Sequence, residues 1–168
     1  MPAVKILRKF TDGRHKHSTC ITAALDAAVA NCRLEGQRLT PLRRRVLELV
    51  WSSHEPVKAY DILDAMRDEK RGAAPPTVYR ALDFLQQQGL VHRIESLNAY
   101  IGCGAPGHEG TGQLLICRDC GEVAEIDDQE IIALIAAKSR KLGFVISSPT
   151  IEIAGLCGRC RAGRGTSK

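Results

Sequence analysis

Two pairs of closely spaced cysteines are the sequence feature that most limits how this chain can fold. Cys117 and Cys120 form one C-x-x-C pair, Cys157 and Cys160 form the other, and 36 residues lie between the pairs. Two intervening residues let both sulfur atoms of a pair face one ion. Four thiolates suit a closed tetrahedral Zn²⁺ site with Zn–S distances of about 2.3 Å. The sequence therefore predicts a structural zinc ion held by all four cysteines.

The same spacing also occurs in thiol–disulfide enzymes, which leaves a C-x-x-C redox enzyme as an alternative. In thioredoxin-type proteins the pair opens a helix of a β-α-β unit, and neither pair here has that context. The chain has no apolar run of 18 residues and no signal-peptide segment at its start. We therefore expect a cytoplasmic protein that is not an enzyme and has no membrane segment or small-molecule substrate. Its seven cysteines are expected to bind metal rather than form disulfides.

The first 103 residues read as four helical segments followed by a hairpin, the order of a winged helix-turn-helix domain. Thr40 is a good N-cap ahead of Pro41, which suits the first turn of a helix. Pro76 begins the fourth helical segment and Gly89 ends it. After Gly89 the hydrophobic period changes to two, which indicates strands on either side of residues 97–98. The expected helices lie at about residues 18–36, 41–53, 57–70 and 76–89, and the expected strands at 90–96 and 99–103.

The charge distribution predicts a basic surface on this domain. The whole net charge of +5 lies in residues 1–103, which hold 16 Lys and Arg against 11 Asp and Glu, whereas residues 104–168 hold 8 of each. A helix-turn-helix places the start of its last helix against base edges, where Arg80 can meet guanine, and nearby arginines can meet phosphates. A solvated surface is the alternative for such charges. The expected DNA-binding residues are Tyr60, Thr77, Tyr79, Arg80, Arg43 and Arg44, with Arg45 beside them.

The second part of the chain reads as a small α+β unit. A segment with five glycines in residues 102–113 separates it from the first part as a hinge. Two short strands around the first C-x-x-C pair follow, then a helix over about Gln129–Leu142 and further strand. A unit of about sixty residues buries little surface, so it needs a metal, a partner or both.

A second group of metal ligands is predicted around the hairpin and the hinge. A turn centred on residues 97–98 places His92 directly opposite Cys103, with Cβ atoms about 4.5–5.5 Å apart. His108 follows in the hinge, and Glu125 lies on the strand after the first C-x-x-C pair. This mixed set of nitrogen, sulfur and oxygen ligands suits Zn²⁺. The alternative is a packed histidine beside a thiol that acts as a small apolar side chain.

Four segments of the sequence resemble the ferric uptake regulator family. They are RLTPLRRRVLELV, AYDILDAMR, PPTVYRALDFLQQQGLVHRIES and ICRDCG…IEIAGLCGRC, and the resemblance covers about residues 36–160. It implies a winged-helix DNA-binding domain, a hinge and a C-terminal dimerisation domain in a metal-activated homodimeric transcription factor. It also implies that Tyr60 and Arg80 read the operator.

The details of the resemblance favour the zinc uptake regulator branch. Iron and peroxide sensors carry an H-H-D-H-type run just before the first C-x-x-C, where this chain reads GHEGTGQLLIC. The pattern H-R-I-E-S-x-N-x-Y…C…H, followed by C-R-D-C-G-x-x-x-E, is similar to the zinc branch. It implies that His92, Cys103, His108 and Glu125 bind a regulatory zinc, which makes two zinc ions per chain. An iron- or peroxide-responsive regulator, and a purely structural zinc protein, are the alternatives.

The expected fold class is α+β, with an N-terminal winged helix-turn-helix domain and a small C-terminal α/β dimerisation domain that carries the four-cysteine zinc site. The N-terminal run His15, His17 and Cys20 has ligand-like spacing, but we interpret it as part of a flexible tail. The expected organisation is a flexible basic tail over 1–18, a winged-helix domain over 19–103, a hinge over 104–113, and a dimerisation and zinc-binding domain over 114–168.

Overall fold

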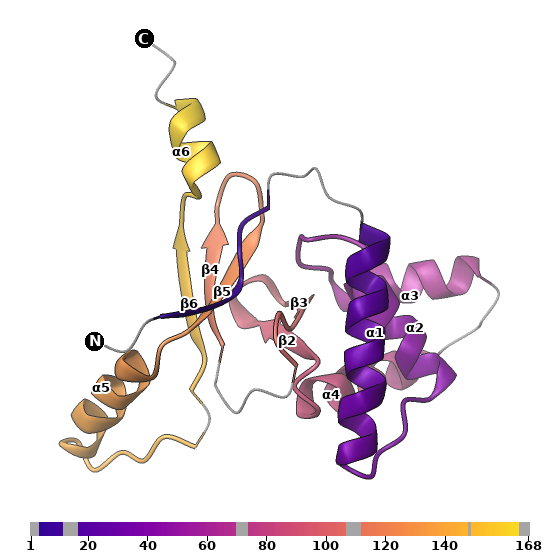
Figure 1. Cartoon of the computed structure of the whole chain (residues 1–168), viewed down its shortest axis with the longest axis horizontal. Coiled ribbons are helices and arrows are strands. Elements are labelled where there is room, and N and C mark those ends of the chain that lie inside the picture. The colour runs from indigo at the N-terminus through magenta and orange to yellow at the C-terminus, as the bar shows by residue number, and fades with distance from the viewer. Residues whose placement is uncertain (1–3, 12–16, 70–73, 107–111, 148, 165–168) are drawn as a thin grey trace. The chain divides into compact units, whose positions relative to one another are not determined.

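The structure, a computed structural model, describes residues 4–11, 17–69, 74–106, 112–147 and 149–164 (Figure 1). The chain divides into two compact units, one of residues 11–108 and one of residues 1–10 together with 109–168. Within the described ranges, no helix is both long enough and apolar enough to cross a membrane. The hinge expected over 104–113 lies partly outside the described residues, and its boundaries remain a prediction.

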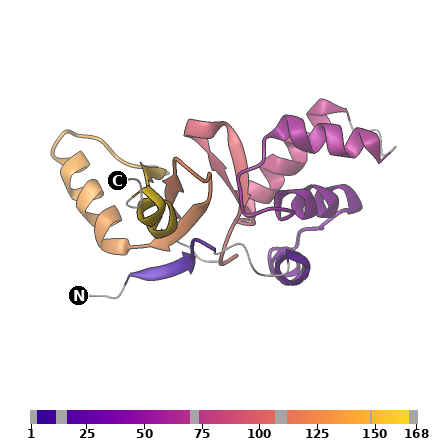
Figure 2. The ribbon, with the colours of Figure 1, turned by 90° about the horizontal axis from the view of Figure 1, so that it is seen from above.

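The unit of residues 11–108 contains helices and one hairpin. Helices α2, α3 and α4 pack against one another, and the hairpin lies against α2 and α4 (Figures 1 and 2). Its core is apolar and draws on every helix, with Leu47, Ile62 and Leu82 among its largest buried side chains. The elements are α1 (His17–Leu34), α2 (Pro41–Val50), α3 (Ala59–Asp68), α4 (Pro75–Gln87), β2 (Val91–Ile94) and β3 (Ala99–Gly102).

Local signals explain where these helices begin and end. Thr40 caps α2, because its hydroxyl oxygen accepts the backbone N–H of Arg43 at 3.4 Å. Helix α4 begins at Pro75, one residue before the expected Pro76, since both prolines fit a first turn whose N–H groups need no partner in the helix. Gly89 follows its C-cap with a φ of +62°. Glycine adopts this left-handed conformation without strain, so the helix stops there.

The register of the hairpin differs from the expected one. A short 3-10 helix, η1 (Glu95–Leu97), replaces the two-residue turn, and Asn98 follows in the left-handed region with a φ of 46°. His92 therefore pairs with Ile101 and not with Cys103. The predicted direct opposition of His92 and Cys103 is wrong, because the turn takes up two residues more on its N-terminal side, Glu95 and Ser96, than the alternation pattern suggested.

The other unit is built on a four-stranded sheet with the order β1-β5-β4-β6. Strands β4 and β6 run parallel, and the other two pairings are antiparallel. Helix α5 starts where the side chain of Asp128 accepts the backbone N–H groups of Glu130 and Ile131. The elements are β1 (Lys5–Arg8), β4 (Gln113–Cys117), β5 (Val123–Asp127), α5 (Gln129–Arg140), β6 (Ile151–Gly155) and α6 (Gly158–Arg164).

Strand β1 corrects the expectation of a flexible tail over residues 1–18. Lys5 pairs with Asp127, Ile6 with Ile126 and Arg8 with Glu125, with a shift of register between Ile6 and Arg8. The strand covers the edge of β5 that faces away from β4, where the backbone groups of β5 would otherwise have no neighbouring strand. The end of the expected tail belongs to α1, which begins at His17, whereas residues 1–3 and His15 lie outside the described residues.

We expect Gly102→Ala to destabilise the unit of residues 11–108 by about 1–3 kcal/mol, the usual cost of overfilling a packed site. A Cβ at Gly102 would overlap the indole ring of Trp51. Trp51 is the only tryptophan of the chain, so its fluorescence reports unfolding of this unit in a urea titration. Gly155→Ala is the control, because a Cβ there meets no atom within 4 Å. Equal unfolding midpoints for the two variants would contradict the tight packing at Gly102.

Candidate metal centre and nucleic-acid interface

The parallel pairing of β4 with β6 brings the two C-x-x-C pairs together. Cys117 ends β4 and lies opposite Gly155, two residues before Cys157. The four cysteine sulfur atoms all lie within 4.8 Å of one another, and Cys120 Sγ is 3.8 Å from Cys157 Sγ. Ligands about 2.3 Å from a central zinc ion at tetrahedral angles lie about 3.8 Å apart. All four are free cysteines, and their number, chemistry and spacing fit Zn²⁺.

The backbone of the cluster favours ionised sulfur at Cys117. The backbone N–H of Cys157 donates to Cys117 Sγ at 3.4 Å. Backbone N–H groups, of Cys120 first and then of Cys157, lower the pKa of the Cys117 thiol to about 6. Hydrogen bonding to the Cys157 sulfur, followed by burial, raises the pKa of Cys160 to about 12. Without a cation the cluster therefore keeps a proton at Cys160, which zinc binding must displace.

Two of the four predicted regulatory ligands lie close together within one unit. The ligand atoms of His92 and Cys103 are within 4.8 Å of each other. Cys103 follows β3, so it is the diagonal neighbour of His92, on the same face of the hairpin. Its backbone N–H donates to the carbonyl of Leu90 at 3.0 Å, and its side chain is fully buried. The pairing was wrong in register, but the prediction of a shared face was right.

Of the other two predicted regulatory ligands, the structure describes only Glu125. His108 lies outside the described residues. Glu125 lies on β5 of the sheet unit, where it pairs with Leu114 of β4, and it is 1% exposed. A Cβ at Gly112 would come within 2.5 Å of Glu125 Oε1, so a glycine at that position leaves room for the carboxylate. The four residues as one zinc site remain a prediction.

The predicted DNA-reading residues are exposed on α3 and α4. Helix α4 buries one face in the core and leaves Thr77, Tyr79 and Arg80 exposed on the other. Tyr60, on α3, is 64% exposed and Tyr79 is 46% exposed. Large aromatic side chains at such exposure are available to a ligand, although exposure alone does not identify one.

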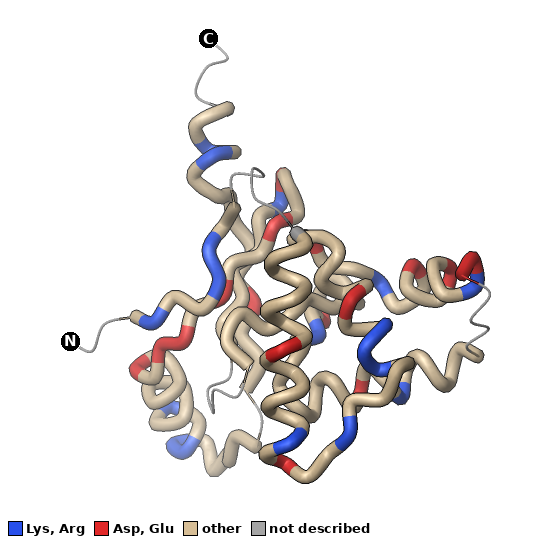
Figure 3. Tube along the Cα trace, turned by 45° about the vertical axis from the view of Figure 1, so that its right-hand side comes forward, with Lys and Arg blue, Asp and Glu red and all other residues tan. Residues whose placement is uncertain are grey.

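The three consecutive arginines of α2 have different surroundings. Figure 3 shows them as one basic stretch of the trace. Arg43 lies with its guanidinium carbon 3.4 Å from the ring centre of Phe84 and donates to the carbonyl of Arg38 at 2.7 Å. It therefore packs α2 against α4, in addition to any contact with phosphate.

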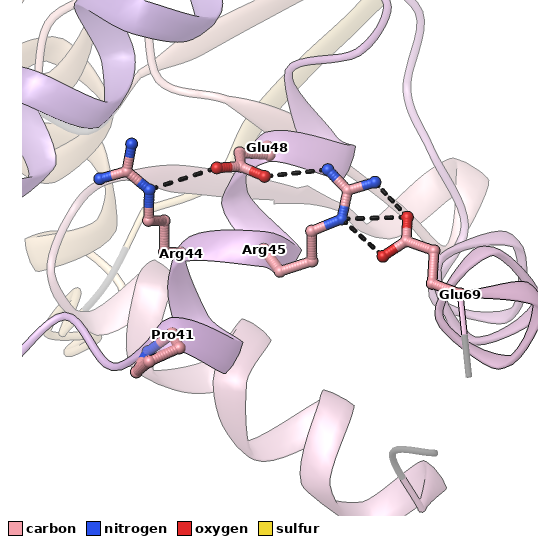
Figure 4. Close-up of a pocket in the computed structure, with 5 residues that line it drawn as sticks. All are labelled: Pro41, Arg44, Arg45, Glu48 and Glu69. Carbon is pink, nitrogen blue, oxygen red and sulfur yellow. Dashed lines mark hydrogen bonds and ion pairs between the residues drawn. The ribbon is translucent and has the colours of Figure 1, made fainter. Parts of the chain in front are cut away.

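Arg44 and Arg45 line a surface hollow that contains a network of ion pairs (Figure 4). Arg44 Nε is 3.2 Å from one carboxylate oxygen of Glu48, and Arg45 Nη1 is 2.9 Å from the other. Arg45 also pairs with Glu69, the residue after α3. The hydrogen bonds that Arg45 donates to Glu69 first, and then to Glu48, raise the pKa of Arg45. Arg45 thus joins α2 to the end of α3, and Arg44, with a half-exposed side chain, is the freer of the two.

Comparisons with known proteins agree on one family. The family model of the ferric uptake regulator family matches residues 34–154. The zinc uptake regulation protein of Escherichia coli (strain K12) is 41% identical over 132 residues, which cover 77% of this chain and 76% of that protein. The zinc uptake regulation protein of Mycobacterium tuberculosis (strain H37Rv) is 32% identical over 130 residues, 76% of this chain and 97% of that protein.

Two solved structures share this fold over most of the chain. Holo XcZur has a TM-score of 0.77 and 39% identity, over 88% of this chain and 99% of that one. A zinc uptake regulator complexed with zinc and DNA has a TM-score of 0.80 and 37% identity, over 86% of this chain and 97% of that one. These matches confirm the expected α+β fold, in which a winged helix-turn-helix domain precedes a small α/β domain. The chain belongs to the ferric uptake regulator family.

Proposed function

We propose that this chain is a zinc-responsive homodimeric transcriptional regulator, which binds palindromic operator DNA when loaded with zinc and represses zinc-uptake genes. The observation that carries the proposal is the similarity, at 37% identity, to a zinc uptake regulator complexed with zinc and DNA. A regulator of this kind acts in the cytoplasm, where the DNA is, and has no catalytic residues. The roles below rest on the residues of this chain.

Two zinc ions per chain have different tasks in this proposal. Cys117, Cys120, Cys157 and Cys160 hold the structural ion, which stabilises the small sheet unit. His92, Cys103, His108 and Glu125 hold the regulatory ion, and these ligands lie before, within and after the glycine-rich segment of residues 102–113. Binding of the regulatory ion then limits the freedom of that segment. Metal at 100 times its dissociation constant favours the bound state by about 2.7 kcal/mol per site, roughly a hundredfold.

That free energy selects one arrangement of the two recognition helices of a dimer. Half-sites of a palindromic operator lie about one helical turn, or a multiple of it, apart. Only dimers with the right distance and angle between their α4 helices meet both half-sites. In each half-site we assign base contact to Arg80, Tyr60, Thr77 and Tyr79, and phosphate contact to Arg44 and Arg43.

Exposed apolar side chains of the sheet unit support dimerisation through this unit. Helix α5, which the structure describes completely, has no buried residue. Leu134 is 57% exposed, Phe144 is 61% exposed and Val145 is 83% exposed. Several large apolar side chains left exposed in one unit are typical of an interface with another protein. A second copy of the chain is the partner that the family resemblance implies.

Three alternative functions differ from the proposed one in how the protein would respond to metal. An iron- or peroxide-responsive regulator would respond to iron or peroxide in place of zinc. Its support is weaker, since a relative named ferric uptake regulation protein, from Bordetella parapertussis, is 29% identical. A purely structural zinc protein would bind one ion tightly and show no zinc-dependent affinity for DNA. A redox enzyme would gain activity as a dithiol when zinc is removed.

We expect purified protein to contain one zinc ion per chain that resists mild chelation and one that exchanges readily. The reason is that four thiolates form a closed site, whereas the mixed ligand set binds less strongly. Elemental analysis before and after dialysis against a chelator measures both. A single resistant ion, with no exchangeable one at any zinc concentration, would contradict the regulatory site.

We expect Cys103→Ser to lose the zinc dependence of operator binding while it retains the resistant zinc ion. The variant removes the thiolate of the regulatory set, so the roughly hundredfold gain in affinity with zinc should disappear. A gel shift on a palindromic operator at buffered zinc concentrations measures the response. Cys20→Ser, a half-buried cysteine on α1 outside both ligand sets, is the matched control. A normal zinc response of Cys103→Ser would show that the assignment is wrong.

We expect Arg80→Ala to weaken operator binding by about 1–3 kcal/mol and to relax preference at one base pair of each half-site. Arg44→Ala should weaken binding to all DNA sequences alike and reduce its salt dependence, because it removes a phosphate contact. Fluorescence anisotropy with operator variants at several salt concentrations separates the two effects. Arg161→Ala, an exposed residue of α6, is the control. The assignment fails if Arg80→Ala loses affinity equally for every sequence.

A further inference from the structure

The four cysteines differ in how far solvent can reach them. Cys117 and Cys157 are buried, whereas Cys120 and Cys160 are partly exposed. A reagent or competing ligand from solution therefore meets the cluster at Cys120 or Cys160. Zinc bound by four thiolates carries a net charge of −2, and sulfur atoms of such a centre stay nucleophilic unless neighbouring groups reduce their negative charge.

Arg159 lies at this accessible side of the cluster. It occupies α6 between Cys157 and Cys160, and its guanidinium Nη2 is 3.5 Å from Glu122 Oε1. Glu122 is two residues past Cys120, and the Cys120 sulfur lies 3.8 Å from the sulfur of Cys157, two residues before Arg159, so the guanidinium lies within hydrogen-bonding reach of the Cys120 sulfur. The arginine therefore contacts the partly exposed sulfur on one side and a carboxylate on the other.

Glu122 is suited to hold that arginine in place. It is 8% exposed, and its backbone carbonyl accepts the N–H of Cys117 at 2.9 Å. A carboxylate so close to four thiolates adds negative charge to the cluster, which a cation nearby must offset. Arg159 has a side chain that is 50% exposed, so water screens part of its effect.

We propose that Arg159, oriented by Glu122, is a positioning residue that shields Cys120 and makes the structural zinc slow to react with thiol-directed electrophiles. A hydrogen bond from a cation lowers the electron density on the thiolate, and the guanidinium covers the approach to it. Zinc at the four cysteines then stays in place while the other site exchanges its ion. The inference rests on the proposed function, in which these cysteines hold zinc.

The test follows zinc release from the full-length protein during reaction with N-ethylmaleimide. A Cys103→Ser background confines the measurement to the four-cysteine ion. A chromogenic chelator records the rate of release, and peptide mass spectrometry records which cysteine reacts first. The variants are Arg159→Ala, Arg159→Lys and Glu122→Gln, with Arg161→Ala as the matched control on the same helix.

We expect Arg159→Ala to release zinc about five- to tenfold faster, with Cys120 modified first. Arg159→Lys should recover part of the protection, because it keeps the charge but loses the planar fork. Glu122→Gln should fall between Arg159→Ala and the unsubstituted background, and Arg161→Ala should match that background. Faster release with equal modification of all four cysteines would indicate general loosening and would overturn the shielding role.

The outcomes separate this inference from the proposed function. Equal rates for Arg159→Ala and Arg161→Ala, in protein that contains the zinc ion, would overturn the inference and leave the zinc site intact. A protein without zinc at the four cysteines would overturn the proposed structural site, and the inference with it.

Discussion

The sheet unit depends on the parallel pairing of β4 with β6. This pairing carries Cys117 and Cys157, which are far apart in the sequence, to the same end of the sheet. Four sulfur atoms within 4.8 Å repel one another as thiolates, and a divalent cation among them turns that repulsion into attraction. Helix α5, complete in the structure, has no fully buried residue, although Ile131 and Ile132 are partly buried. A unit with so little apolar burial needs the cation, or a partner against α5, to remain folded.

The unit of residues 11–108 is held together by different physics. Its helices share one apolar core, and the hairpin is tied to it by the backbone pairing of Val57 with Tyr100, with N–H···O distances of 2.9 and 2.8 Å. Trp51 lies directly against Gly102, which precedes Cys103. Packing therefore fixes the position of Cys103 without a metal ion. A ligand site that includes Cys103 is therefore held rigidly on this side by the packed core.

The sequence was a better guide to elements than to pairings. The start of helix α4 was predicted to within one residue and its end to within two, because proline and glycine mark its ends. The hairpin register was wrong, since alternation of side chains does not show that Asn98 takes the left-handed conformation that sets the turn. Strand β1 was missed, because its partner β5 lies more than a hundred residues away and no local pattern points to it. Arg159 was visible between two cysteines, but its contact with Glu122 required the fold.

The contrast between the two units bears on how a metal could act as a signal in this chain. Backbone pairing of β2 with β3 already keeps His92 near Cys103. An ion that binds them does not have to build the hairpin, so little of its binding free energy is spent on folding this unit. In the proposed regulatory site, that free energy would then be available to restrain the other assigned ligands, Glu125 among them. At the four cysteines the ion instead stabilises the fold of the sheet unit. Such an ion is unsuited to signal the zinc concentration, because its loss would unfold the unit that has to respond.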